Sequence, residues 1–182
     1  MKNLYFIFYA TLFFILLASS TIRCQNESTT EYSKDFLLQE AKEIMTNSGT
    51  CTLITLDTEG IPRARVMDPF SPEEDLSVWF GTNSKSRKVD QIKNDPRVSL
   101  YYFDCNTTDY VLIHGMAKLV NDQNEKEKRW KDEWNDFYPN RTEGYLLIEV
   151  SPIWMEILST SRGIYGDSIS WEPPKVILDS KD

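Results

Sequence analysis

The alternation of apolar and polar positions along the chain predicts one helix followed mostly by strands. Residues 36–45 carry apolar side chains at helical spacing, and Asn47-Ser48-Gly49 ends that helix. Runs rich in β-branched and aromatic residues follow, separated by turn residues such as Asp57-Thr58-Glu59-Gly60. These runs predict strands at residues 51–57, 63–67, 76–81, 98–104, 110–120 and 145–157, the last interrupted near Ser151-Pro152. Six strands with short connections fit a closed or split β-barrel.

The segment at residues 79–96 carries the clearest functional signal. A strand, a polar turn and a short helix that stops before Pro96 follow one another there. The turn gathers Lys85, Arg87 and Lys88 where the helix begins. A helix start already carries partial positive charge and free backbone N–H groups, so these cations are unfavourable there unless an anion is bound.

Phosphate suits this helix start, because hydroxyls and cationic groups can converge on its oxygens together with backbone N–H groups. Thr82, Ser84 and Ser86 supply hydroxyls in the same turn. The alternative is a basic turn that is simply solvated. The residue pattern alone leaves both interpretations open.

The same segment resembles the flavin-phosphate segment of the pyridoxamine 5′-phosphate oxidase-like proteins. The resemblance rests on Thr82-Asn83, Ser86-Arg87-Lys88, Gln91-Ile92 and the run from Asn94 to Leu100. It implies that Thr82, Arg87 and Lys88 bind the phosphate of FMN, with Ser86 in the same site and Gln91 nearby. It also implies a mainly β fold with flanking helices, a six-stranded split barrel of the FMN-binding type. The general stress protein branch is the most similar one.

The strand at residues 63–67 extends the resemblance toward the flavin ring. Arg63 and Arg65 lie on one face of that strand, since side chains alternate. The resemblance implies that Arg65 is a phosphate ligand, whereas Arg63 is expected to be solvated. Val66 and Met67 are expected to offer backbone groups to the edge of the isoalloxazine ring.

Two departures from the family separate this chain from the vitamin-synthesising oxidase. That enzyme has a Lys shortly after the Arg-containing strand, whereas Asp68 follows the strand here. It also has an Arg-x-His near its C-terminus, whereas residues 159–165 contain no His. Both features help to hold its phosphorylated substrate, so we expect no oxidation of pyridoxamine phosphate. The second substrate stays unidentified.

The N-terminus has the features of a signal peptide. Lys2 precedes an apolar run at residues 4–18, which is shorter than the roughly 20 residues of a membrane helix. Small residues follow the run, so we expect cleavage at about residues 20–24 and export to the periplasm or beyond. The expected domains are a signal peptide at 1–24 and one FMN-binding split barrel at 25–182, without a membrane span after cleavage.

Composition narrows the possible partners. A net charge of −8 and a pI near 4.8 disfavour nucleic acid, which the chain as a whole would repel. Three cysteines are too few for a disulfide scaffold, although Cys51 and Cys105 could pair if their strands are neighbours. Their spacing shows no metal-binding pattern.

Neither the single histidine nor the aromatic residues near the C-terminal half identifies a catalytic group. His114 lacks a partner of the kind that a triad needs, so we expect a strand histidine at the surface or a pocket rim. Trp130, Trp134 and Phe137 share one face of an expected helix, and with Tyr138 they suggest packing in the core or in the homodimer that the family implies. Stacking on the flavin is the second interpretation of this face. Two functions stay open: a flavin-dependent oxidoreductase, or a non-enzymatic protein that binds flavin or another ligand such as haem or a deazaflavin.

Overall fold

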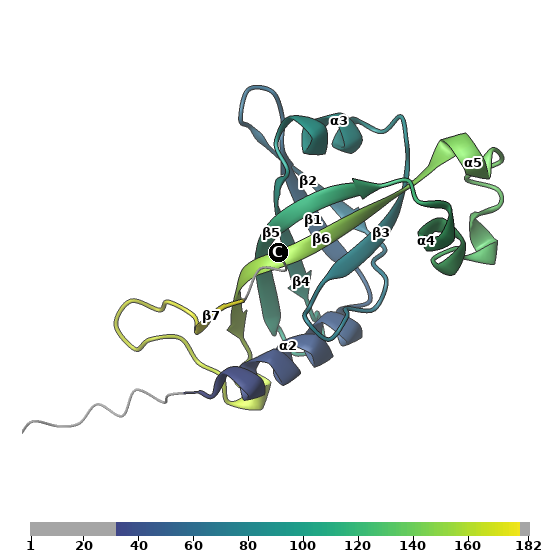
Figure 1. Ribbon diagram of the computed structural model, residues 1–182. Coiled ribbons are helices and arrows are strands. Elements are labelled where there is room, and N and C mark those ends of the chain that lie inside the picture. Colours follow the sequence, from purple (N-terminus) through teal and green to yellow (C-terminus); the bar gives the residue numbers. More distant parts are fainter. Residues whose placement is uncertain (1–31, 179–182) are drawn as a thin grey trace, which may run out of the picture. The chain divides into compact units, whose positions relative to one another are not determined.

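The described part of the chain, residues 32–178, is built on one antiparallel sheet in the computed structural model (Figure 1). Its strands are β1 (Cys51–Leu56), β2 (Pro62–Met67), β3 (Val78–Asn83), β4 (Arg97–Phe103), β5 (Tyr110–Val120), β6 (Tyr145–Leu158) and β7 (Lys175–Ile177). Its helices are α2 (Lys34–Ser48), α3 (Arg87–Asn94), α4 (Gln123–Lys128) and α5 (Arg141–Gly144), with 3-10 turns η1 (Asp132–Trp134) and η2 (Thr160–Arg162). The expected signal peptide lies outside the described residues.

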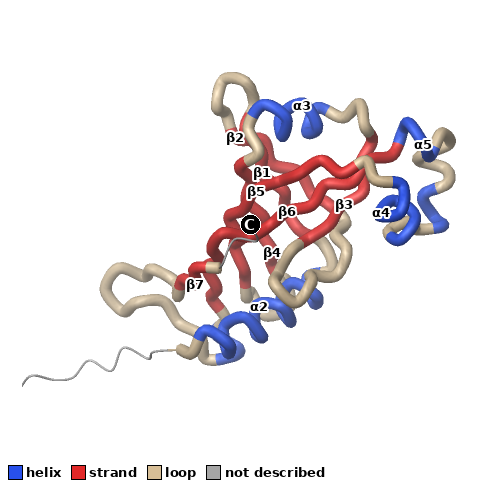
Figure 2. Tube along the Cα trace, viewed as in Figure 1, coloured by secondary structure: helices blue, strands red, loops and turns tan. Residues whose placement is uncertain are grey.

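The sheet has the order β2-β1-β4-β5-β6-β3, and β7 pairs with the far part of β6. It curls around the core, as the tube in Figure 2 shows, and the helices lie at its ends. Strand residues that alternate with the outward ones point into this core; Leu53, Leu100 and Ile113 are fully buried there. The expected mainly β, split-barrel fold is therefore confirmed.

Helix α2 closes one end of the curled sheet. Its N-cap is Ser33, whose hydroxyl accepts the backbone N–H of Phe36 at 3.2 Å, and it ends before Gly49 at a φ of 65°. Leu37, Ala41 and Ile44 are buried against the strands, which is the apolar face that the sequence predicted. At the other end, α3 lies over the sheet beside β2 (Figure 1).

All six predicted strands are present, and the structure adds a seventh. Strand β7 has three residues and follows Pro173-Pro174, so its alternation is too short to recognise in the sequence. Strand β6 is continuous through Ser151-Pro152, but the irregularity that the sequence predicted there is present as a β-bulge. His114 of β5 pairs with Trp154 and Gly115 pairs with Pro152, so Ile153 is the extra residue on β6.

The predicted aromatic helix is wrong. Helix α4 ends at Lys128, and only a short 3-10 turn follows. The rings of Trp130, Trp134 and Tyr138 lie around the buried Tyr145, with centroids 5.2–5.6 Å from its ring. This packing overrides the helical pattern and gives a second small core inside one chain. Only Phe137 of the four aromatic residues is strongly exposed, at 74%.

Both described cysteines are free thiols, so the pairing that the sequence allowed is not formed. Cys51 is buried, and this burial raises the pKa of its thiol to about 12, whereas Cys105 is exposed in the turn after β4. In a Cys24→Ser variant we therefore expect one thiol to react promptly with a thiol reagent at pH 8, and the second only after unfolding. Two promptly reacting thiols in the native protein would contradict this burial.

No helix within residues 32–178 is both long enough and apolar enough to cross a membrane.

Candidate functional site

Three elements meet at the candidate phosphate site. Strand β2 brings Arg65, the end of β3 brings Thr82, and the first turn of α3 brings Ser86, Arg87 and Lys88. The chain must turn sharply between β3 and α3, and it does so with polar residues whose backbone is held locally: the N–H of Ser86 donates to the carbonyl of Asn83 at 3.0 Å. The turn therefore places the start of α3 directly beside the β2–β1 edge of the sheet.

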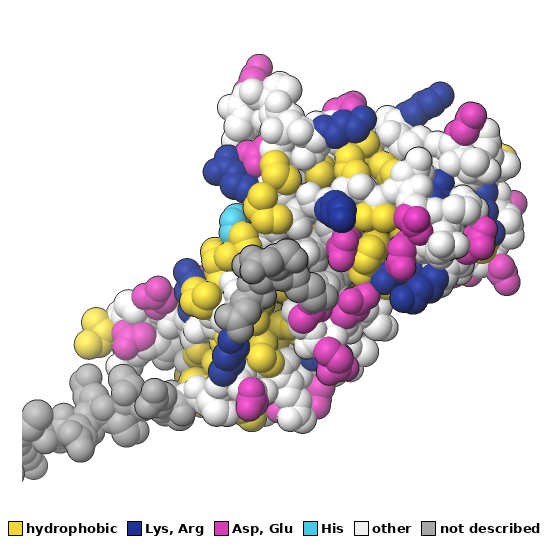
Figure 3. Space-filling view, viewed as in Figure 1, with side chains coloured by type: hydrophobic (Ala, Val, Ile, Leu, Met, Phe, Trp, Pro, Cys, Tyr) yellow, Lys and Arg dark blue, Asp and Glu magenta, His cyan; other side chains and the backbone are white. Residues whose placement is uncertain are grey.

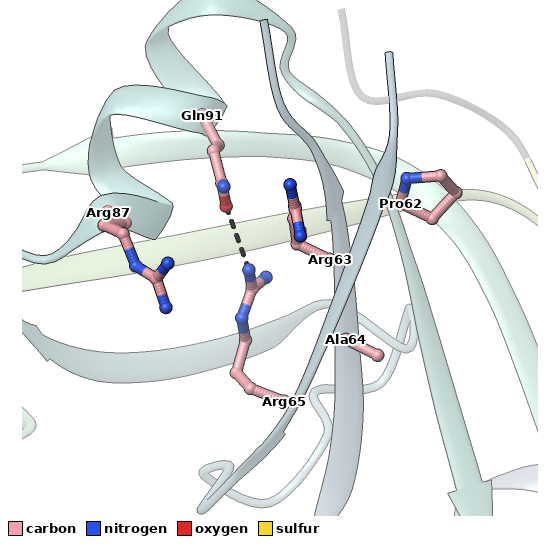
Figure 4. A pocket seen from close by; sticks show the side chains of 6 residues that line it. All are labelled: Pro62, Arg63, Ala64, Arg65, Arg87 and Gln91. Atoms are coloured by element: carbon pink, nitrogen blue, oxygen red, sulfur yellow. Dashed lines mark hydrogen bonds between the residues drawn. The ribbon is translucent and has the colours of Figure 1, made fainter. Parts of the chain in front are cut away.

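Arg65 is held in place by neutral groups only. Its guanidinium donates to the hydroxyl of Thr55 at 2.7 Å. It also donates to the side-chain oxygen of Gln91 at 2.9 Å, as Figure 4 shows. The Thr55 hydroxyl donates to the same Gln91 oxygen at 2.6 Å. This network fixes the orientation of Arg65 without neutralising its charge. It also leaves the side-chain NH₂ of Gln91 without a partner in the described protein, so this group can donate to a ligand.

Arg87 lies opposite Arg65 across a cavity of about 360 Å³ (Figure 4). The cavity is lined by Pro62, Arg63, Ala64, Arg65, Arg87 and Gln91. Within residues 32–178, Arg87 makes no ion pair or hydrogen bond through its side chain, and Arg65 makes no ion pair. The pKa of Arg65 is lowered, first by burial and then by the positive charge of Arg87. Two guanidinium groups thus face one space without a carboxylate between them.

Lys88 completes the cluster from the first turn of α3. Its ammonium donates to the hydroxyls of Thr82 at 3.0 Å and of Ser86 at 3.3 Å, and these two hydroxyls lie 3.3 Å apart. The pKa of Lys88 is lowered, first by burial and then by the charge of Arg65. Ser86 precedes the helix but its side chain does not cap it, so the first backbone N–H groups of α3 stay free to bind an anion.

These donors fit a phosphate group. The site offers three cations, two hydroxyls and a helix start, and all of them favour a multiply charged anion. Burial and mutual repulsion lower the pKa values of Arg65 and Lys88, which is unfavourable for the cations until an anion compensates them. The solvated-turn alternative fits less well, because Lys88 is half-buried and Thr82 is buried.

The residues expected at the flavin ring lie on an open sheet edge. Val66 and Met67 end β2, and within residues 32–178 this strand pairs only with β1, so its other edge has no strand partner there. Val66 is 71% exposed, whereas Met67 packs partly against the main core. Free backbone N–H and C=O groups beside an apolar surface suit the polar edge of a flat ring.

The structure separates the other candidates from this site. Ser84 donates its hydroxyl to the carbonyl of Glu143 at 2.7 Å, and Lys85 lines a different cavity beside Phe137. Arg63 borders the cavity between Arg65 and Arg87, and its guanidinium lies 2.7 Å from the carboxylate of Asp57.

His114 lies on the outer face of β5 and stacks on Trp154, with ring centroids 5.3 Å apart. Its Nδ1 is 3.4 Å from the hydroxyl of Ser99. In the part of the chain that the structure describes, no group of three or more His, Cys, Asp or Glu residues could hold a metal ion.

Sequence reasoning missed Thr55, which joins Arg65 to Gln91. A signal was available: Cys51, Leu53 and Thr55 are the inward positions of β1, and all three are buried. A polar side chain at the inward end of an apolar strand needs a hydrogen-bond partner, so Thr55 could have been singled out.

The chain differs from the vitamin-synthesising oxidase at position 68 and within residues 159–165. In both places a charged side chain is engaged in ion pairs. The Asp68 carboxylate lies 2.7 Å from the ammonium of Lys131. In the tail, Arg162 lies 2.6 Å from Glu40 and 2.7 Å from Glu43 of α2. Neither position 68 nor residues 159–165 therefore offer an unpaired cation to a substrate phosphate.

Comparisons with known proteins agree with the resemblance seen in the sequence. The profile of the family described as pyridoxamine 5′-phosphate oxidase like matches residues 38–161. General stress protein 26 of Bacillus subtilis is 25% identical over 118 residues, which span 63% of this chain and 82% of that protein.

Solved structures show the same fold. A protein related to general stress protein 26 from Clostridium acetobutylicum has a TM-score of 0.66 at 19% identity, covering 81% of this chain and 98% of that one. A pyridoxamine 5′-phosphate oxidase-related, FMN binding protein from Nostoc punctiforme has a TM-score of 0.56 at 16% identity, covering 80% and 94%. A heme binding protein from Mycobacterium smegmatis has a TM-score of 0.55 at 17% identity, covering 66% and 53%.

Proposed function

The chain belongs to the family of pyridoxamine 5′-phosphate oxidase-like proteins, and from this we propose that it is an exported flavoprotein that binds FMN at the Arg65–Arg87–Lys88 cluster. The observation that carries the proposal is that none of these three cations makes an ion pair within residues 32–178. Arg65, Arg87 and Lys88 hold the phosphate, Thr82 and Ser86 donate hydroxyl hydrogen bonds, and the free NH₂ of Gln91 adds a further donor.

FMN, when bound, supplies hydride or electron transfer at its ring, and the protein supplies position and electrostatics. The open edge of β2 at Val66 and Met67 orients the ring with backbone groups. Because FMN carries out the electron transfer, a redox function does not require a catalytic side chain from the protein. We propose that the protein is a redox protein and that its electron donor is a compound other than pyridoxamine phosphate.

Haem is the alternative that one structural neighbour suggests, since that protein is a heme binding protein. Haem iron needs an axial ligand such as His, Cys, Met or Tyr. None of these lines the Arg65–Arg87 cavity, and the one histidine, His114, lies on the outer face of the sheet. The cavity therefore favours FMN over haem.

The proposed cofactor is tested by an absorbance spectrum of the purified protein, followed by mass identification of the compound released on denaturation. We expect a flavin spectrum and the mass of FMN. A haem spectrum, or no bound or bindable flavin, would refute the proposal.

The proposed lack of pyridoxamine phosphate oxidase activity is tested on the same FMN-loaded sample. Because Asp68 and Arg162 are both paired within the chain, we expect no stoichiometric turnover of pyridoxamine phosphate. Turnover would show that another group holds the substrate phosphate.

Export is tested by cell fractionation with N-terminal sequencing: cytoplasmic protein that retains Met1 would rule it out.

We also propose that the working unit is a homodimer formed through the outer face of the sheet. The outward side chains of its central strands are Thr52, Ile54, Ser99, Tyr101, Leu112, His114, Trp154 and Glu156. At the two edges of this face Val66 and Ile177 are 71% and 62% exposed. Figure 3 shows hydrophobic side chains near the one histidine. A second copy is the occupant that we infer, because this face adjoins the flavin edge of β2 and an isologous contact covers both copies at once.

This surface replaces the aromatic residues that the sequence suggested for the interface. Trp130, Trp134 and Tyr138 pack around Tyr145 of their own chain, so they have little area left for a partner. The outer face has the mixed apolar and aromatic character that dimer interfaces show at their centre.

A further inference from the structure

The segment between β5 and β6 packs behind the turn that carries the phosphate donors. We call residues 121–144 the brace; it contains α4, the 3-10 turn η1 and α5, and none of its residues belongs to a strand. Figure 1 shows α4 and α5 beyond the β3 edge of the sheet, and the turn from β3 to α3 begins at the end of this strand. The proposed contacts to FMN give the brace no role.

The turn itself, residues 84–86, lies beyond the support of the sheet. The pairing of β3 with β6 ends at Asn83, and α3 begins only at Arg87. Lys85, Arg87 and Lys88 follow one another closely here, and like charges repel. Because this repulsion favours an open turn until an anion is bound, a preformed site needs bonds from the turn to another part of the protein.

Ser84 supplies these bonds. Its backbone N–H donates to the carbonyl of Gly144 at 2.9 Å, and its hydroxyl donates to the carbonyl of Glu143 at 2.7 Å. Within residues 32–178, these are the only hydrogen bonds that join the turn to anything other than its flanking elements, β3 and α3. Both carbonyls belong to the end of α5, where a helix has carbonyls without partners inside the helix.

The position of α5 depends on a buried lysine of α4. Lys126 is only 2% exposed, and its ammonium donates to the carbonyl of Thr142 at 2.8 Å and to the side-chain oxygen of Asn121 at 3.0 Å. It makes no ion pair within the described part of the chain. A buried ammonium is unfavourable unless its hydrogen bonds are made, so Lys126 holds α5 where the Thr142 carbonyl meets it.

Three consecutive carbonyls of α5, at residues 142–144, thus accept hydrogen bonds from only two residues, Lys126 and Ser84. The connection runs without a gap from α4 through α5 to the phosphate turn. Groups that bind a ligand must be held within about 0.5 Å of their productive positions. A displacement of α5 is passed on to the turn, because Ser84 follows the carbonyls to which it donates.

The brace also lies directly against the backbone of β3. Gly81 precedes Thr82, and a Cβ at this glycine would lie 2.5 Å from the ring of Trp134 and 2.9 Å from the ring of Tyr145. Only a residue without a side chain allows this approach. The ring of Trp134 therefore supports β3 immediately before the first hydroxyl of the phosphate site.

We propose that the brace is a positioning element of the phosphate site, in which Lys126 and Ser84 hold the turn in the shape that directs its donors at the phosphate. Neither residue touches the ligand, because Lys126 is buried and the hydroxyl of Ser84 is bonded to α5. The inference rests on the proposed FMN binding. It adds that the brace determines the affinity for the phosphate and leaves the affinity for the flavin ring unchanged.

Removal of the Ser84 hydroxyl provides the first test. In Ser84→Ala we expect FMN to bind about fivefold more weakly, because the turn loses one of its two bonds to α5, whereas the dissociation constant of riboflavin should change by less than about twofold. Ser84→Thr keeps the hydroxyl and should restore the wild-type affinity for FMN. Ser48→Ala is the matched control, since the Ser48 hydroxyl also donates to a backbone carbonyl, that of Ile44 at 2.8 Å, but lies in α2. It should leave both affinities unchanged.

Removal of the buried ammonium provides the second test. Lys126→Met keeps an unbranched side chain of similar length, and we expect FMN to bind at least about tenfold more weakly while riboflavin again changes by less than about twofold. When Ser84→Ala is added, the dissociation constant of FMN should stay within about twofold of that for Lys126→Met alone, since both changes interrupt the same connection. Losses that multiply would contradict a single connection.

Urea unfolding confirms that each variant is folded under the titration conditions. If Lys126→Met does not fold, Ser84→Ala and its rescue by Ser84→Thr decide the question by themselves.

The outcomes separate this inference from the proposed function. A wild-type protein that prefers FMN to riboflavin, and keeps all of that preference in Ser84→Ala, contradicts the brace alone. Equal losses of FMN and riboflavin affinity also contradict it, because the brace would then support the fold and not the phosphate donors. Absence of FMN binding to the wild-type protein contradicts the proposed function itself.

Discussion

Replacing Arg87 and Lys88 together by alanine is expected to weaken FMN binding by at least two orders of magnitude. Hydrogen bonds to charged groups contribute roughly 1.5–3 kcal/mol each, and about 1.4 kcal/mol corresponds to a factor of ten. Arg87 has no partner within the described chain that would lose a contact, and Lys88 contacts only two hydroxyls. The substitution therefore removes ligand contacts with little effect on the fold.

The dissociation constant of FMN, from fluorescence titration of the apoprotein, measures this loss. Lys85→Ala is the matched control, because Lys85 lies in the same turn and has the same charge but lines the neighbouring cavity. It should change FMN affinity by less than about threefold, the range of a screened surface charge. An unchanged affinity in the double variant would remove the phosphate assignment.

Replacing Gly115 by alanine is expected to destabilise the protein by about 2–3 kcal/mol, a typical penalty for overpacking. A Cβ at this position would lie 2.4 Å from the backbone oxygen of Ser151 on β6. Backbone cannot move aside as a flexible side chain can, so the β5–β6 pairing must shift. This close approach of two backbones explains why β5 has a glycine at position 115, next to the register shift between His114 and Gly115.

Urea unfolding followed by tryptophan fluorescence measures this loss. Gly144→Ala is the control, because a Cβ there meets nothing within 4 Å. We expect the control to stay within about 0.5 kcal/mol of wild type, as surface substitutions usually do. Equal stability of the Gly115→Ala variant would show that the two strands can separate at this point without loss.

The strands were predictable because their side chains alternate between core and surface. Leu53, Leu100 and Ile113 are buried at every second position of their strands, and this period of two is visible in the sequence. What alternation does not reveal is a partner. Strand β7 depends on pairing with β6, and the rings of Trp130 and Trp134 depend on Tyr145, which belongs to the next strand.

The clustering of the candidate phosphate ligands was predictable to a similar degree. Thr82, Ser86, Arg87 and Lys88 lie within one turn, so their order in the sequence already places them together. Arg65 comes from another strand, and its place beside Arg87 followed from the family resemblance; the structure brings the two to the same cavity.

The connections within the site were beyond sequence reasoning. The hydrogen bonds that join Thr55, Arg65 and Gln91 link three separate elements. The exposure of Trp171 could not be predicted either. Its position near Pro173 predicts a loop, but a residue in a loop can be buried or exposed.

Comparison of FMN with riboflavin on the wild-type apoprotein tests the central claim most directly, since the two ligands share the ring and differ only in the phosphate. If Arg65, Arg87 and Lys88 hold that phosphate, titration should give FMN a dissociation constant at least about 100-fold lower than that of riboflavin. Equal dissociation constants for the two ligands would contradict the account.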